Sequence, residues 1–125
     1  TIMAPTGEFL WVEGEAQLDA VTALSGSGPA YVFYFLEAMV RAGTSMGLST
    51  AQAHQLAVGT FVGAAQLAQR SDEPPAVLRE RVTSKGGTTY AALQCLEQNH
   101  VAEHFMRAME AARERARELG DEFGA

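Results

Sequence analysis

The spacing of hydrophobic and polar residues predicts a chain built almost entirely of helices. From Glu15 onward, apolar residues recur every three or four positions, which is the period of an amphipathic helix. Glycine, proline and hydroxyl residues interrupt this pattern where helices are expected to begin and end. The predicted helices cover residues 15–26, 29 to beyond 42, 50–70, 75–82, 90 to about 98, and about 101–119.

The second predicted helix carries the largest apolar surface. Pro29 suits the first helical position, where its missing N–H costs nothing, and Ser27 or Gly28 is expected to cap the helix. Only Glu37 and Arg41, spaced to form a pair, interrupt the apolar residues that follow. A helix that is apolar on nearly every side belongs in a core or in a subunit interface.

The third predicted helix combines a clear start with small residues. Ser49 and Gln52 have the spacing of a capping box, which marks its first turn. Gly59 and Gly63 each cost about 1 kcal/mol relative to alanine, which suggests that another backbone passes close by. Its inward stripe comprises Ala53, Leu56, Ala57, Thr60, Ala64 and Leu67.

The last predicted helix has two contrasting faces. Arginine and glutamate fill one face, which is expected to be solvated, and the tail after Gly120 is expected to fray. The apolar stripe expected to face inward comprises Val101, Phe105, Met109, Ala112, Ala116 and Leu119.

The residues before Glu15 do not follow the helical pattern. The run Phe9–Val12 predicts one strand, and no neighbouring sequence offers it a partner. The sequence also does not begin with methionine. We therefore expect residues 1–14 to be the end of a preceding domain together with a linker.

Composition narrows the classes of function. A chain of 125 residues, 47% of them hydrophobic, has the size of one globular domain and is expected to bury its own core. Nine basic against fifteen acidic residues give a net charge of −6, which argues against a nucleic-acid partner. The single cysteine, Cys95, fits a reducing, cytoplasmic location. The longest apolar run, Ala30–Leu36, is far shorter than the roughly 20 residues that a membrane span needs.

Two short motifs carry weak signals for chemistry. "GSGPAY" is similar to the opening of a dinucleotide-binding motif, but Tyr31 occupies the third glycine position and no strand precedes it, so a tight turn between helices is expected. "HVAEH" places His100 and His104 four residues apart, as in zinc proteases, but the only other histidine is His54 in another helix, and no metal site is expected. Cys95 is expected to be a packed, inert thiol.

The loop "TSKGGTT" is the stronger candidate. Two consecutive glycines let backbone N–H groups turn toward one point, and a helix that begins just after them adds its free N–H groups and the positive end of its dipole. Such a cradle would suit a carboxylate or a phosphate. An ordinary capped turn between helices explains the same residues equally well. The residues alone leave both readings open.

The stretches "DAVTALSGSGPAYVFYFLEAM" and "VTSKGGTT" together resemble the C-terminal domain of pyrroline-5-carboxylate reductase, over Trp11 to about Leu119. The resemblance implies an all-α helical bundle that forms an intertwined dimer, as in the C-terminal domain of 6-phosphogluconate dehydrogenase, and such dimers often assemble into rings. It also implies that NADPH or NADH is carried mainly by a separate N-terminal domain. Residues 1–14 would then be the end of a missing Rossmann domain plus a linker, and residues 15–125 the helical dimerisation and substrate-binding domain.

The resemblance also implies roles for individual residues. Ser84 and the N–H groups of Gly86, Gly87 and Thr88 would receive the substrate carboxylate, and Thr89, as the catalytic residue, would hydrogen-bond the ring nitrogen. Thr83 matches the family loop as well, whereas Lys85 stands where the family commonly has proline, which loosens the turn. The nicotinamide end of the cofactor would lie near Ser25, Gly26, Ser27 and Gly28.

The implied reaction is hydride transfer from NAD(P)H to the C=N carbon of 1-pyrroline-5-carboxylate, which gives L-proline. The loop contains no histidine or acid, and such a reaction hardly needs one because the cofactor carries the chemistry. The chain by itself is expected to be inactive. Two alternatives remain: a helical oligomerisation module without a ligand, and the helical domain of a dehydrogenase acting on a hydroxy acid. Relatives of the second kind usually place a catalytic lysine in their helical domain, and Lys85, in a loop, is a poor substitute.

Overall fold

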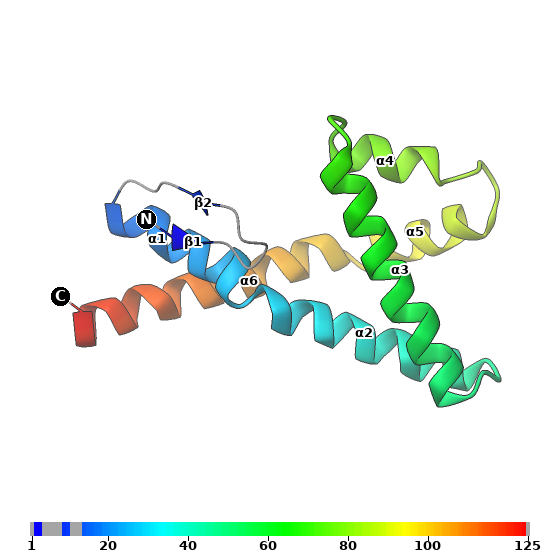
Figure 1. Cartoon of the computed structure of the whole chain (residues 1–125), viewed down its shortest axis with the longest axis horizontal. Helices are drawn as coiled ribbons and strands as arrows, with labels where there is room; N and C mark the ends of the chain where they lie inside the picture. The colour runs from blue at the N-terminus through cyan, green and yellow to red at the C-terminus, as the bar shows by residue number, and fades with distance from the viewer. Residues whose placement is uncertain (1, 4–8, 11–13, 125) are drawn as a thin grey trace. The chain divides into compact units, whose positions relative to one another are not determined.

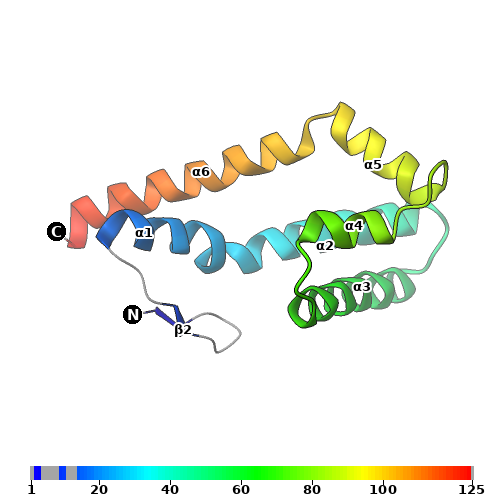
Figure 2. The same cartoon turned by 90° about the horizontal axis from the view of Figure 1, so that it is seen from above.

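The computed structural model describes residues 2–3, 9–10 and 14–124, and it confirms the predicted all-α fold (Figures 1 and 2). Two compact units are distinguished, one of residues 1–32 with 100–125 and the other of residues 33–99, and each is described by itself. The elements in chain order are β1 (Ile2–Met3), β2 (Phe9–Leu10), α1 (Gly14–Val21), the π-helical turn η1 (Thr22–Gly26), α2 (Gly28–Ser45), α3 (Thr50–Arg70), α4 (Pro75–Arg81), α5 (Thr88–Gln98), α6 (Val101–Leu119) and the π-helical turn η2 (Gly120–Gly124).

The two short strands correct one prediction. β2 pairs antiparallel with β1, with Ile2 opposite Leu10 and Met3 opposite Phe9, so the predicted strand does have a partner. The five residues between the strands allow such a hairpin. The other half of the predicted strand, residues 11–12, lies outside the described residues.

In the first unit, α1 and η1 lie against α6, and Figures 1 and 2 both show α1 alongside the C-terminal part of α6. Ala23 is buried where η1 meets α6. The rings of Tyr31 and Phe105 meet edge to face, with their centroids 5.3 Å apart. The predicted stripe of α6 is confirmed as its less exposed face, except that Leu119 is 39% exposed. After Leu119, η2 continues the chain as one helical turn over Gly120–Gly124, and the fraying of this tail stays a prediction.

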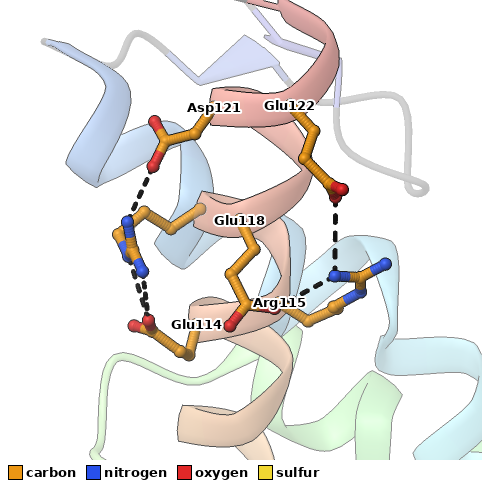
Figure 3. Close-up of polar contacts among 6 residues, drawn as sticks. Glu114, Arg115, Glu118, Asp121 and Glu122 are labelled. Carbon is orange, nitrogen blue, oxygen red and sulfur yellow. Dashed lines mark hydrogen bonds and ion pairs between the residues drawn. The ribbon is translucent and has the colours of Figure 1, made fainter.

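The outer face of α6 carries ion pairs (Figure 3). Arg117 contacts both Glu114 and Asp121, and Arg115 contacts Glu118 and, at 3.7 Å, Glu122. The hydrogen bond from Arg117 lowers the pKa of the Glu114 carboxyl and raises the pKa of the Arg117 guanidinium. All these side chains are exposed, so the pairs add little to stability individually.

In the second unit, α3 begins as predicted. The Ser49 hydroxyl accepts a hydrogen bond from the Gln52 amide at 3.1 Å, and the Gln52 side chain accepts one from the Ser49 amide at 3.0 Å, which completes the capping box. The prediction that another backbone passes close to Gly59 and Gly63 is wrong within the described chain, because a Cβ at either position would meet no atom within 4 Å. The close approach lies instead at Gly43, where a Cβ would be 2.9 Å from that of Ala53.

The prediction that the chain buries its own core is also wrong for the described residues. Only Ala23, Ala53 and Ala57 are buried, and α2 contains no buried residue. Phe33 and Tyr34 of α2 are 66% and 68% exposed. Such a large exposed apolar surface is typical of an interface rather than of a complete domain, so the interface reading of α2 is the one left open. No helix within the described ranges is both long and apolar enough to span a membrane.

Candidate functional site: the loop before α5

The loop between α4 and α5 begins where α4 is closed off. The Thr83 hydroxyl donates a hydrogen bond to the carbonyl oxygen of Arg79 at 2.6 Å, and the Thr83 amide donates one to the carbonyl of Glu80 at 3.1 Å. These bonds occupy carbonyl groups that the end of a helix leaves without partners. Thr83 therefore fixes the point at which the chain leaves α4.

A tight turn follows. The Gly87 amide donates a hydrogen bond to the Ser84 carbonyl at 2.9 Å, with Lys85 and Gly86 at the two central positions. Gly86 has φ of +76°, as the third residue of a type II turn requires, and only glycine adopts this angle readily. A Cβ on Gly87 would lie 3.2 Å from the Ser84 carbonyl oxygen. The backbone of the turn thus requires glycine at Gly86, whereas a side chain at Gly87 would force the turn to shift slightly.

The N-terminus of α5 opens directly from this turn. Helix α5 begins at Thr88, two residues earlier than predicted, and its N-cap is Gly87, which has no side chain to accept a hydrogen bond. The amides of Thr88, Thr89 and Tyr90 belong to the first turn of α5, so they have no hydrogen-bond acceptor within the helix. The first turn also holds no acidic residue. Three N–H groups and the positive end of the helix dipole are therefore directed toward an incoming group, which favours an anion.

The side chains around this N-terminus are polar. Ser84, Lys85 and Thr88 are exposed, and Thr89 is partly buried. The loop thus brings together all the residues predicted for the carboxylate and the ring nitrogen, namely Ser84, Gly86, Gly87, Thr88 and Thr89. An ordinary side-chain cap, the competing reading of these residues, is not formed at Gly87.

The segment predicted to lie near the cofactor is a turn in the other unit. The Ser27 amide donates to the Thr22 carbonyl at 2.9 Å, which closes the π-helical turn η1, and the Ser25 hydroxyl donates to the Val21 carbonyl at 3.1 Å. The Tyr31 hydroxyl donates to the Ala23 carbonyl at 2.6 Å. Helix α1 precedes the segment, so this is the turn between helices that the sequence predicts.

The remaining candidate residues do not form a site within the described part of the chain. His100 adopts the left-handed conformation, with φ of 54°, as the N-cap of α6, and its Nδ1 lies 3.7 Å from a Glu103 carboxylate oxygen. No three His, Cys, Asp or Glu side chains of the described residues are grouped as a metal would need. The prediction of a packed Cys95 is wrong, because its thiol lies on an uncovered face of α5 and is exposed.

The family is decided by comparison with known proteins. A family profile described as pyrroline-5-carboxylate reductase dimerisation matches residues 15–119, which include the whole loop before α5. The chain belongs to this family. Among the similar proteins is the pyrroline-5-carboxylate reductase of Pseudomonas aeruginosa, which is 46% identical over 123 residues, or 98% of this chain and 45% of that protein.

Solved structures of pyrroline-5-carboxylate reductases show the same fold. The Coxiella burnetii enzyme matches with a TM-score of 0.84 and 43% identity, over 88% of this chain and 41% of that one. The Plasmodium falciparum pyrroline carboxylate reductase, solved with NADP bound, matches with a TM-score of 0.82 and 37% identity, over 86% of this chain and 41% of that one. The chain spans less than half the length of these relatives.

Two contacts in this fold are not indicated by the sequence pattern. The hydrogen bond from Tyr31 to the Ala23 carbonyl spans eight residues, a separation that helical periodicity does not register. The contact between Gly43 and Ala53 joins two helices, and only the small size of both residues hints at it. By contrast, the sequence alone located the loop before α5, because its glycines have a local conformational reason.

Proposed function

We propose that this chain is the C-terminal helical part of a pyrroline-5-carboxylate reductase, which reduces 1-pyrroline-5-carboxylate to L-proline with NADPH or NADH. The observation that carries the proposal is the uncapped N-terminus of α5 behind the Ser84–Gly87 turn, within the region that the family profile matches. Residues 1–14 would be the end of the nucleotide-binding domain and its linker, and residues 15–125 the dimerisation and substrate-binding domain.

The substrate carboxylate would lie at the mouth of α5. The amides of Thr88 and Gly86 and the Ser84 hydroxyl would donate hydrogen bonds to it, and the Gly87 amide, which already donates to the Ser84 carbonyl, would act mainly by holding the turn. Backbone donors are fixed by the turn, so little reorganisation is needed on binding. The first turn of α5 contains no acidic residue, so no carboxylate of that turn competes for these donors.

Thr89 would position the reacting ring. Its hydroxyl lies one residue into α5, where it can accept a hydrogen bond from the protonated ring nitrogen of the substrate. Hydride then adds to the C=N carbon, and the electron pair of the π bond passes to nitrogen, which keeps its proton as the amine of proline. Thr89 contributes orientation, and the nicotinamide cofactor supplies the hydride.

The cofactor would contact this chain only at its nicotinamide end. A Cβ on Gly28 would meet no atom within 4 Å, so no other described residue covers the turn at this position. Its Ser25 hydroxyl and Ser27 amide already donate hydrogen bonds within the turn. The segment would contribute only an edge of the cofactor site, and the main binding site would belong to the N-terminal domain.

We also propose that the chain forms a homodimer and that it is located in the cytoplasm. Met39, one of the exposed apolar residues of α2, lines a shallow groove of about 120 Å³ between α2 and α3, and a second copy of the chain is the partner that the dimerisation family favours. Residues that line this groove are Met39, Gly43, Leu48, Ala53, Leu56, Ala57 and Thr60. The same surface would serve the alternative function, an oligomerisation module without substrate.

The test is a chimera in which residues 15–125 replace the matching part of the Pseudomonas aeruginosa relative. We expect this protein to oxidise NADPH only when 1-pyrroline-5-carboxylate is present, and the 125-residue chain alone to be inactive. A chimera that dimerises normally but never reduces the substrate would favour the oligomerisation module. Reduction of the substrate by the chain alone would overturn the assignment of the cofactor site to a separate domain.

A further inference from the structure

We propose that Lys85 captures the substrate carboxylate and discriminates against analogues that lack this group. The inference rests on the proposed function, because it adds a charge to the hydrogen-bonding site at the mouth of α5. Lys85 is the only lysine in the 125-residue sequence. It occupies the second position of the Ser84–Gly87 turn, directly before the two glycines of the site.

Along the sequence, Lys85 is the main charged residue in and around this loop. Residues 82–96 contain no other charged side chain, and Arg81, which precedes them, is engaged with Glu73 at 3.2 Å. The salt bridges of the described residues include none to Lys85, whose side chain is exposed. In a chain with a net charge of −6, this cation offsets the repulsion that an approaching carboxylate would meet.

The chemistry of lysine suits capture rather than alignment. An ammonium group on a flexible four-carbon stem acts as a point charge and imposes little geometry on its partner. Geometry at this site is instead supplied by the turn, in which Gly86 holds φ of +76°. Loss of the charge should therefore raise KM and leave kcat nearly unchanged.

The measurement uses the chimera with Lys85→Gln, assayed at about 0.01 M and about 1 M salt, between which the screening length falls from about 30 Å to about 3 Å. We expect KM for 1-pyrroline-5-carboxylate to rise about three- to tenfold at low salt, with kcat changed less than twofold, and the difference to disappear at high salt. KM for 1-pyrroline, which lacks the carboxylate, should not rise at either salt concentration.

Three further variants separate charge from turn geometry. Lys85→Arg keeps the charge and should preserve the low KM. Lys85→Pro removes the charge but suits the second position of a type II turn, so it should raise KM as Lys85→Gln does. Arg70→Gln gives the same net charge as Lys85→Gln from outside the loop and should leave KM unchanged.

The outcomes distinguish this inference from the proposed function. If Lys85→Pro keeps the low KM of the parent chimera, or if KM for 1-pyrroline rises as much as KM for 1-pyrroline-5-carboxylate in Lys85→Gln, the role of Lys85 as a capturing charge is overturned. If Lys85→Gln has no effect while Thr89→Val reduces activity, the inference fails and the proposed function stands. A chimera without reductase activity overturns both.

Discussion

The amide of Gly87 donates a hydrogen bond to the carbonyl oxygen of Ser84 at 2.9 Å, immediately before the first helical residue of α5. This bond closes a tight turn that leads directly into the first residue of α5. The glycine that makes it is also the N-cap, and it supplies no side chain to occupy the free N–H groups. One residue thus closes the turn and leaves the end of the helix open.

Gly87→Ala should weaken substrate binding more than folding. The added Cβ would lie 3.2 Å from the Ser84 carbonyl oxygen, so the turn must shift by a few tenths of an ångström. We expect KM of the chimera to rise at least fivefold, while the free energy of unfolding falls by no more than about 1 kcal/mol. Gly120→Ala is the control, since a Cβ there meets no atom within 4 Å, and an equal rise of KM in both variants would contradict this account.

Tyr31→Phe should destabilise the turn η1. The variant removes the hydrogen bond to the Ala23 carbonyl at 2.6 Å but keeps the ring that contacts Phe105. We expect a loss of about 0.5–1.5 kcal/mol in the free energy of unfolding, measured by urea denaturation. Tyr34→Phe removes the hydroxyl of a tyrosine that is 68% exposed and should change stability very little, so equal effects would argue against an anchoring role for Tyr31.

Ser49→Ala should weaken the start of α3. The substitution removes the side-chain half of the capping box, in which the Ser49 hydroxyl accepts from the Gln52 amide. A cost of about 1 kcal/mol is expected, together with a lower thermal midpoint by circular dichroism. Ser45→Ala, at the end of α2, is the matched control. If Ser49→Ala leaves the free energy of unfolding unchanged, the capping box does not stabilise the start of α3.

Arg117→Gln should lower stability at neutral pH but not in acid. The hydrogen bond from Arg117 lowers the pKa of Glu114 below its ordinary value of 4.5 (Figure 3). A carboxyl with a lowered pKa in the folded state stabilises the protein above its unfolded pKa, and this contribution disappears as the pH falls through the folded pKa.

The check is the difference in thermal midpoint between the parent chain and Arg117→Gln, followed from pH 7 to pH 3. The difference should be small at pH 7, shrink with added salt and vanish below the lowered pKa of Glu114. Arg107→Gln, which removes an arginine outside the ion pairs described for α6, is the control. A difference that grows in acid would contradict the role assigned to this pair.

The sequence predicted those elements that have local causes. The capping box at Ser49 and Gln52 located α3, and the glycines at 86 and 87 located the turn before α5. Burial could not be predicted in the same way, because periodicity shows which face of a helix is apolar but not what covers it. The exposure of Phe33 and Tyr34 in α2 and of the Cys95 thiol therefore could not be predicted from the sequence.

The π-helical turn η1 could likewise not be predicted from the sequence. The bond from the Ser27 amide to the Thr22 carbonyl shifts the hydrogen-bond register by one residue, and the pattern of apolar side chains does not record such a shift. The pairing of β1 with β2 was missed because two-residue strands are too short to show an alternating pattern.

We have proposed that the loop before α5 holds the substrate with Thr89 at its reacting nitrogen. The most direct test of this proposal is kcat/KM for 1-pyrroline-5-carboxylate in the chimera, compared between Thr89→Val and the control variant Thr50→Val, which lies at the start of α3 outside the groove. Loss of a hydrogen bond to a charged group, about 1.5–3 kcal/mol, predicts a decrease of about 10- to 100-fold for Thr89→Val alone. A Thr89→Val value within twofold of the parent would contradict the account.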